Sequence, residues 1–106
     1  MQLIIKNAAP RVVKELITDM DWLYYDFLNN TRPVCDVINP IRSSSLNSVN
    51  LYQNRSLDFV FIDASHEYED VKKDIDNYYN LLNNKGIIFG DDYYNFVGVQ
   101  KAVTQY

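Results

Sequence analysis

Three aspartates and one histidine in the second half of the chain are the residues best suited to chemistry. Asp63 directly follows an apolar stretch, Asp91 and Asp92 follow another, and His66 lies shortly after Asp63. Carboxylate oxygens can bind a hard divalent cation, or accept hydrogen bonds from the hydroxyl or amine of a ligand. A histidine can accept a proton from a substrate hydroxyl at neutral pH. These four residues therefore form the candidate site of the chain.

A metal and a purely structural arrangement both account for the aspartates. Like charges that lie close together repel one another unless a cation compensates, and oxygen ligands favour magnesium, calcium or manganese over zinc. In the structural alternative, one aspartate caps the following helix and the other two lie in a solvated loop. His66 would then be a partly exposed residue in the first turn of a helix. Placement of all three aspartates at one edge of a sheet would strengthen the functional interpretation, and at this point both alternatives stay open.

Two apolar stretches and the helix between them would position the site. Leu57–Ile62 is almost continuously apolar, as is typical of a strand covered on both faces, and residues 87–89 form a second short strand. Between them, apolar residues recur at helical spacing: Tyr68, Val71, Ile75, Tyr78, Tyr79 and Leu82. Such βαβ crossovers are parallel and right-handed, so both strands end at the same edge. Ligands bind at that edge in open α/β sheets.

The first half of the chain is predicted to be rich in helix. Apolar spacing predicts a long amphipathic helix over residues 10–29, and β-branched residues predict a short strand over residues 34–38. The serines at 43–45 offer an N-cap to a short helix that ends by Asn54. Together these elements predict a single α/β domain over residues 1–106. Its helix-rich front part covers residues 1–56, and its βαβ unit covers residues 57–106.

Composition argues against several classes of protein. The chain has 106 residues, a net charge of −4 and a single cysteine, Cys35. It therefore has no internal disulfide and no cysteine-rich zinc motif. The absence of a basic stripe argues against binding to duplex nucleic acid. No apolar run approaches the roughly 20 residues that span a bilayer, and no secretory signal is recognisable, so we expect a cytoplasmic protein with small-molecule or protein partners.

A resemblance to a known family runs through the second half of the chain. Three stretches carry it: LDFVFIDASHEYEDVKKDI at 57–75, LLNNKGIIFGDDY at 81–93, and GVQKAV at 98–103. They resemble the region of the fourth and fifth strands in class I S-adenosylmethionine-dependent methyltransferases, and most of all methyltransferase family 24, whose kin include macrolide sugar and caffeoyl-CoA O-methyltransferases. The implied fold is a truncated Rossmann-like parallel sheet of about three to four strands, flanked by helices.

The resemblance also implies roles for individual residues. The metal-dependent relatives bind magnesium through an aspartate that ends the fourth strand and an acidic pair that ends the fifth, which points to Asp63, Asp91 and Asp92. His66 is then in a position to be the catalytic base, and Asp63 is catalytic through the metal. Part of an adenine pocket would be retained by Ser45 together with Asp63, Ala64 and Ser65, so these residues are the expected contacts of S-adenosylmethionine.

The chain departs from the family pattern in its front half. Class I methyltransferases bind the cofactor through a glycine-rich turn after their first strand, whereas the glycines here are Gly86, Gly90 and Gly98. The chain thus resembles a methyltransferase without its front third and its final strands. Loss of the first strand would leave residues 59–62 with an open apolar edge. Residues 3–5 could supply a substitute strand, or two chains could pair edge to edge as a homodimer.

Two functions of different classes follow from this resemblance. The first is small-molecule O-methyl transfer from S-adenosylmethionine, assisted by Mg²⁺, in which this chain acts alone or is completed by a partner chain that covers the open edge. The second is a non-catalytic binding or assembly module that keeps the methyltransferase fold. A flavodoxin-like or phosphate-binding domain is less consistent with the sequence, because the turns at the strand ends carry carboxylates that would repel phosphate.

Overall fold

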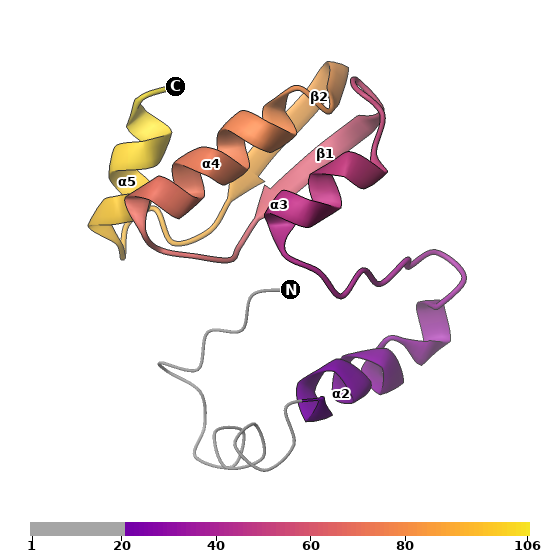
Figure 1. Cartoon of the computed structure of the whole chain (residues 1–106). Coiled ribbons are helices and arrows are strands. Elements are labelled where there is room, and N and C mark those ends of the chain that lie inside the picture. The colour runs from indigo at the N-terminus through magenta and orange to yellow at the C-terminus, as the bar shows by residue number, and fades with distance from the viewer. Residues whose placement is uncertain (1–20) are drawn as a thin grey trace. The chain divides into compact units, whose positions relative to one another are not determined.

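The computed structural model describes residues 21–106, which group into two compact units, 21–42 and 43–106 (Figure 1). The predicted apolar segment at residues 3–5 and the first half of the predicted long helix lie outside the described residues. The short helix that was expected in the front part of the chain belongs to the second unit. None of the helices within residues 21–106 is long and apolar enough to cross a membrane.

The unit at residues 21–42 contains one helix and a turn. Helix α2, Trp22–Asn30, ends where the Thr31 hydroxyl donates to the Phe27 carbonyl at 2.8 Å. A 3-10 turn, Arg32–Val34, follows at once. Within the same unit, the Arg42 guanidinium pairs with the Asp21 carboxylate and lies over the ring of Tyr24. The end of the predicted helix is thereby confirmed to within one residue.

The predicted strand over residues 34–38 is wrong. Val34 closes the 3-10 turn, and the amide of Val37 donates to the Val34 carbonyl at 3.1 Å, so the backbone is turned where the prediction made it extended. Pro33 has a fixed φ that suits the first positions of such a turn. Both valines are exposed, with 46% and 78% of their surface accessible. Their β-branched side chains therefore gain nothing from packing, and the local turn decides the conformation.

The unit at residues 43–106 is a βαβ fold with a further helix at each end. Strand β1, Leu57–Ile62, and strand β2, Leu82–Gly90, are parallel neighbours and are joined by helix α4, Tyr68–Tyr79. Helix α5, Val97–Thr104, follows β2. The α/β class and the parallel pairing are confirmed, with two strands within residues 21–106 where about three to four were expected. This architecture is compatible with a truncated Rossmann-like fold.

Strand β2 begins five residues before the predicted start. The prediction placed Leu82 in the helix, but α4 ends at Tyr79 and the amide of Leu81 turns back to the Tyr78 carbonyl at 3.0 Å. The amide of Leu57 then donates to the Leu81 carbonyl at 2.8 Å. Leu82 is paired with Leu57 in the register of the sheet. Strand β2 therefore begins early because Leu82 pairs with β1. The spacing of apolar residues in the sequence cannot reveal this pairing.

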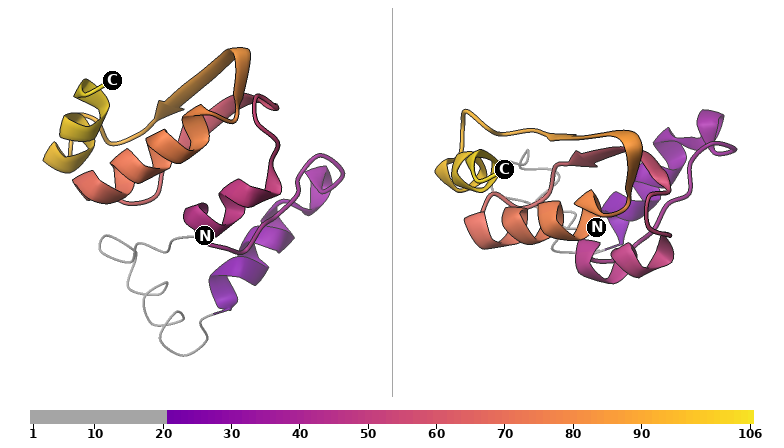
Figure 2. Two further views of the ribbon diagram at one scale, coloured as in Figure 1. Left: turned by 45° about the horizontal axis from the view of Figure 1, so that its top comes forward. Right: turned by 90° about the horizontal axis from the view of Figure 1, so that it is seen from above.

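The core lies between the sheet and the helices that cover it. Val71 and Ile75 from α4 and Val99 and Ala102 from α5 are buried together. From the sheet, Ile62 and Ile88 pack against this cluster, and so do the rings of Tyr68 and Phe96. In both views of Figure 2 the helices of this unit lie on one side of the two strands. Burial of this helix-facing layer is what holds the strand ends in place.

The opposite side of the sheet is uncovered within residues 43–106. Alternate residues of a strand point to opposite faces, and the register pairs Phe59 with Ile87 and Phe61 with Phe89. These four residues form the exposed sheet face, and each has more than half of its surface accessible. The rings of Phe61 and Phe89 lie 5.1 Å apart, centroid to centroid. The expectation that β1 is covered on both faces is therefore wrong for this unit.

A short helical segment precedes β1. Helix α3, Ser45–Ser48, continues into a 3-10 turn, Val49–Leu51. The Ser44 hydroxyl oxygen accepts from the amide of Asn47, which confirms the predicted serine N-cap. The segment is tied to α4 because the Tyr78 hydroxyl donates to the Ser45 carbonyl at 2.7 Å.

Candidate functional site

The two strands bring the three predicted aspartates together. Ile62 and Gly90 are opposite each other at the ends of β1 and β2, so Asp63 and Asp91 leave the sheet at the same level. The amide of Asp91 donates to the Ile62 carbonyl at 3.2 Å and fixes this arrangement. One carboxylate oxygen from each of Asp63, Asp91 and Asp92 lies within 4.8 Å of the others. We call these three residues the acidic cluster.

The spacing of the acidic cluster suits a hard cation. Two oxygens that bind one Ca²⁺ at about 2.4 Å can lie up to about 4.8 Å apart, and two that bind Mg²⁺ at about 2.1 Å up to about 4.2 Å. Three oxygens of one ion cannot all be opposite one another, so the observed limit of 4.8 Å is compatible with Ca²⁺ after a small inward movement of the side chains, and with Mg²⁺ or Mn²⁺ after a slightly larger one. Asp63 and Asp91 are exposed and Asp92 is half-buried, so an ion can reach all three.

Asp92 has a left-handed backbone with a φ of 68°. Aspartate tolerates this conformation better than most residues with a Cβ, although it still costs about 1 kcal/mol. The turn is closed by local bonds: the amide of Asp92 donates to the Asp91 carboxylate at 2.7 Å, and the amide of Phe96 donates to the Asp92 carbonyl at 3.2 Å. The turn thereby places the Asp92 carboxylate near those of Asp63 and Asp91 and in contact with His66.

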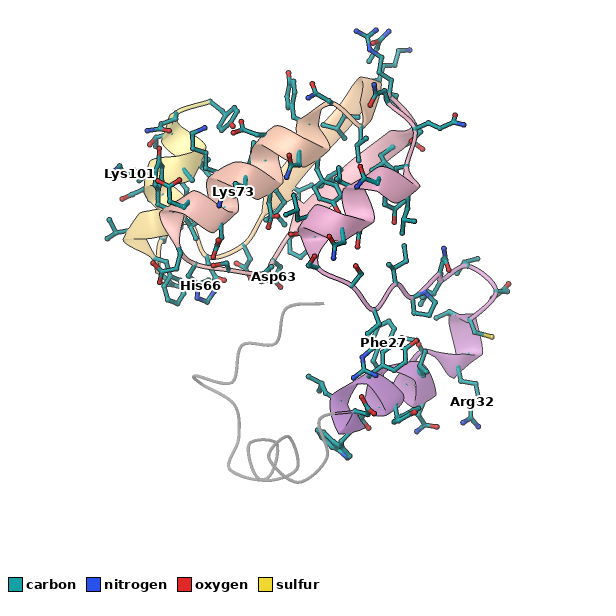
Figure 3. The ribbon with its side chains drawn as sticks, in the orientation of Figure 1. Phe27, Arg32, Asp63, His66, Lys73 and Lys101 are labelled. Carbon is teal, nitrogen blue, oxygen red and sulfur yellow. The ribbon has the colours of Figure 1, made fainter. Side chains whose placement is uncertain are left out.

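His66 is held in one position from two sides. Its Nε2 lies 2.8 Å from Oδ2 of Asp92, and its ring stacks on Phe96 with centroids 3.6 Å apart. Figure 3 shows Asp63 and His66 at the same edge of the unit. With its proton on Nε2, where Asp92 accepts it, the imidazole keeps Nδ1 as its basic atom.

Gly98 at the start of α5 allows the backbone of His66 to come close. A Cβ at this position would lie 2.3 Å from the His66 carbonyl oxygen and 2.9 Å from the Tyr68 amide nitrogen. Backbone atoms cannot move aside as a flexible side chain could, so only glycine fits without displacing α5. Gly98 thus lets the backbone at His66 pack directly against the start of α5.

The serines predicted to contact the cofactor have local partners. The Ser65 hydroxyl donates to the Asp70 carboxylate at 2.8 Å and accepts from the amide of Glu67 at 3.1 Å, as in a helix N-terminus. The Ser45 hydroxyl donates to Asp74 at 2.6 Å. Burial raises the pKa of Asp74, the hydrogen bond from Ser45 opposes that rise, and the nearby Asp70 charge adds to it.

A cavity of about 350 Å³ opens beside the acidic cluster. It lies between the sheet, α4 and α5, and its apolar lining consists of Ile62, Val71, Ile75, Ile88, Phe89, Val99 and Val103. Ala64, Ser65, Tyr93 and Tyr106 also line it, together with the acidic cluster. Ser45 is not among the lining residues, so the structure separates it from the other three predicted cofactor contacts. Among residues 21–106, no lysine or arginine lines this cavity.

Comparison with known families agrees with the geometry. A family model described as a methyltransferase domain matches residues 25–93, which is more than half of the chain. The chain belongs to this methyltransferase family. No curated protein and no solved structure matches the chain. The matched segment contains the acidic cluster and His66, and it ends before α5 begins.

Sequence reasoning missed the contribution of α5 to the candidate site. Val99, Val103 and Tyr106 line the cavity from this helix and the chain just after it. The apolar spacing within residues 97–103 is the signal that could have indicated a buried helix face. Nothing in that stretch carries a polar group that would have pointed to a ligand.

Proposed function

We propose that this chain is a methyltransferase domain that uses S-adenosylmethionine to methylate a hydroxyl group of a small molecule, with Mg²⁺ bound by the acidic cluster. Membership of the methyltransferase family supports methyl transfer. The proposal of a metal ion and of a hydroxyl acceptor rests on one observation. Three carboxylates converge at the strand ends, next to a histidine that contacts Asp92. Oxygen-only ligands of this kind suit Mg²⁺.

The residues of the site divide the chemistry between them. Asp63, Asp91 and Asp92 would hold a divalent ion, which would supply positive charge that favours loss of the acceptor's proton. His66 would take that proton on Nδ1, because Nε2 is engaged by Asp92. The cofactor would supply the methyl group: the acceptor oxygen would form a bond to the methyl carbon while the carbon–sulfur bond breaks and its electron pair stays on sulfur. Asp63 and Ala64, at the end of β1, would border the cofactor.

Calorimetric titration of S-adenosylmethionine into the purified chain, with and without Mg²⁺, tests this proposal. We expect micromolar binding that Asp63→Ala abolishes. Asp76→Asn is the matched control, because Asp76 lies on the exposed surface of α4 and pairs only with Lys72 at 2.9 Å. Absence of binding to the wild-type chain in both conditions would overturn cofactor use by this chain alone.

One observation supports a second function. The glycines are Gly86, Gly90 and Gly98, so the chain has no glycine-rich turn ahead of Asp63 to hold the cofactor. A non-catalytic binding or assembly module that keeps the methyltransferase fold is the alternative. It would bind neither S-adenosylmethionine nor its demethylated product in the same titration.

We also propose that a second copy of the chain covers the sheet. The exposed sheet face is apolar and contiguous, and such patches on soluble proteins mark interaction sites. Within residues 21–106, β1 pairs on one side only, so its other edge is open to a partner strand as well. A cytoplasmic location is part of the proposal, because the exposed single thiol of Cys35 suits a reducing compartment.

A further inference from the structure

The cavity and the acidic cluster form one continuous site with two chemically different parts. Seven apolar residues line the cavity, and the three aspartates of the acidic cluster line it as well. Val71, Ile75 and Val99 are core residues with at most 8% of their surface exposed, so the floor of the cavity is built from well-packed positions. A pocket of this size, with apolar walls and a few convergent polar groups, is typical of small-molecule sites.

The charge of the site is balanced only in part within residues 21–106. The acidic cluster carries three negative charges when ionised; Asp92 contacts His66 at 2.8 Å, whereas no lysine or arginine of these residues lines the cavity. Two lysines of the helices that cover the sheet have other partners: Lys72 pairs with Asp76, and Lys101 lies over the ring of Tyr68. A divalent ion would neutralise two of the three charges. One negative charge then remains for the ligand to satisfy.

We propose that the ligand of this cavity is a hydrophobic amine: a molecule with an apolar body and a positively charged amino group. The body lies among Ile88, Val99 and Val103, and the ammonium group donates hydrogen bonds to the acidic cluster. Hydrogen bonds between an ammonium group and carboxylates are among the stronger ones in proteins. The inference rests on the proposed function in one respect, which is that this ligand is the molecule whose hydroxyl group accepts the methyl group.

The aromatic side chains of the rim fit the same ligand. Tyr93 lines the cavity directly after the acidic pair, and its ring meets that of Tyr94 edge to face with centroids 5.2 Å apart. An ammonium group near the face of a tyrosine ring gains further electrostatic attraction. A carboxylate-bearing ligand with the same body would meet repulsion from both the acidic cluster and the ring faces.

Three probes with one body and different head groups test the inference: phenylpropylamine, phenylpropanol and phenylpropionate. Each is titrated into the full chain by calorimetry, in EDTA and again in Mg²⁺, without S-adenosylmethionine. We expect the amine to bind about tenfold or more tightly than the alcohol in both conditions, and the carboxylate to bind weakest in EDTA. Equal affinity for amine and alcohol, or no binding of the amine, would overturn the inference.

Two substitutions separate the parts of the site. Asp91→Asn should weaken binding of the amine about tenfold and leave the alcohol unchanged, whereas Asp76→Asn should change neither. Val103→Trp, which fills the cavity from α5, should weaken all three probes together. Because cofactor is absent from these titrations, a failure of methyl transfer leaves their outcome unaffected. Amine binding without any methylation would contradict only the proposed function, and methylation without amine preference would contradict only the inference.

Discussion

Nε2 of His66 lies 2.8 Å from Oδ2 of Asp92, and this contact joins the candidate base to the acidic cluster. The two residues are far apart in the sequence: His66 follows β1, and Asp92 follows β2. A cation at the cluster and a proton on the imidazole therefore act on the same carboxylate. The left-handed turn at Asp92 is the local feature that makes this sharing possible.

Asp92→Asn should change the tautomer of His66. The asparagine side chain can present its amide group to Nε2 as a donor, which favours the imidazole with its proton on Nδ1. We expect nitrogen NMR of the labelled ring to report Nε2–H in the wild type and a larger Nδ1–H population in the variant. Any methyl transfer should fall by at least about a hundredfold, because the basic atom is turned away from the substrate. Absence of the Nε2–H signal in the wild type would refute the assigned hydrogen bond.

Gly98→Ala should destabilise the fold. Helix propensity alone predicts that alanine is better by about 1 kcal/mol. The new Cβ, however, would lie 2.3 Å from the His66 carbonyl oxygen, and overpacking against backbone costs about 1–3 kcal/mol. Urea unfolding should therefore show a net loss in the free energy of unfolding. Val97→Ala on the same helix is the control, since Val97 is 80% exposed and should change stability by less than about 0.5 kcal/mol.

Asp74→Asn should reveal a pH-dependent cost of the buried carboxylate. Burial raises the pKa of Asp74 in the folded state, so its contribution to stability is present at low pH and is lost as the pH rises through the raised value. Asparagine keeps an acceptor for the Ser45 hydroxyl and does not ionise. The free energy of unfolding of the wild type minus that of the variant should fall as the pH rises above the ordinary pKa of an aspartate. A difference that grows with pH, or that Asp76→Asn reproduces, would contradict this reading.

Phe61→Lys should dissociate the proposed dimer. Phe61 is 55% exposed at the centre of the exposed sheet face, where a lysine in each copy would place like charges against each other. We expect the wild type to sediment as a dimer and the variant as a monomer with unchanged circular dichroism. Tyr94→Lys is the matched control, because Tyr94 is 93% exposed and lies outside that face. A wild type that sediments as a monomer at all concentrations would rule out pairing through this surface.

Much of the second half of the chain could be predicted from its sequence. The bounds of β1, the helix that carries Val71 and Ile75, and the meeting of Asp63 with Asp91 follow from apolar periodicity and from the handedness of βαβ units. These features follow from apolar patterns that are clear in the sequence, and from one general rule about how parallel strands are connected.

Other features depend on tertiary partners that no local pattern records. The start of β2 at Leu82 follows from pairing with Leu57, and the 3-10 turn at Val34 follows from the absence of packing that would favour an extended chain. The contact between His66 and Asp92 depends on one left-handed residue. The cavity depends on where α5 packs, which the close approach at Gly98 determines.

Binding of Mn²⁺, followed by electron paramagnetic resonance, tests the account most directly. Mn²⁺ takes the same oxygen ligands as Mg²⁺, and its signal separates free from bound ion. We predict stoichiometric binding to the wild type, a large loss of binding in Asp63→Asn and in Asp91→Asn, and unchanged binding in Asp76→Asn, whose carboxylate pairs with Lys72 on the surface of α4. Equal binding in all four proteins, or none in the wild type, would contradict a cation site at the strand ends.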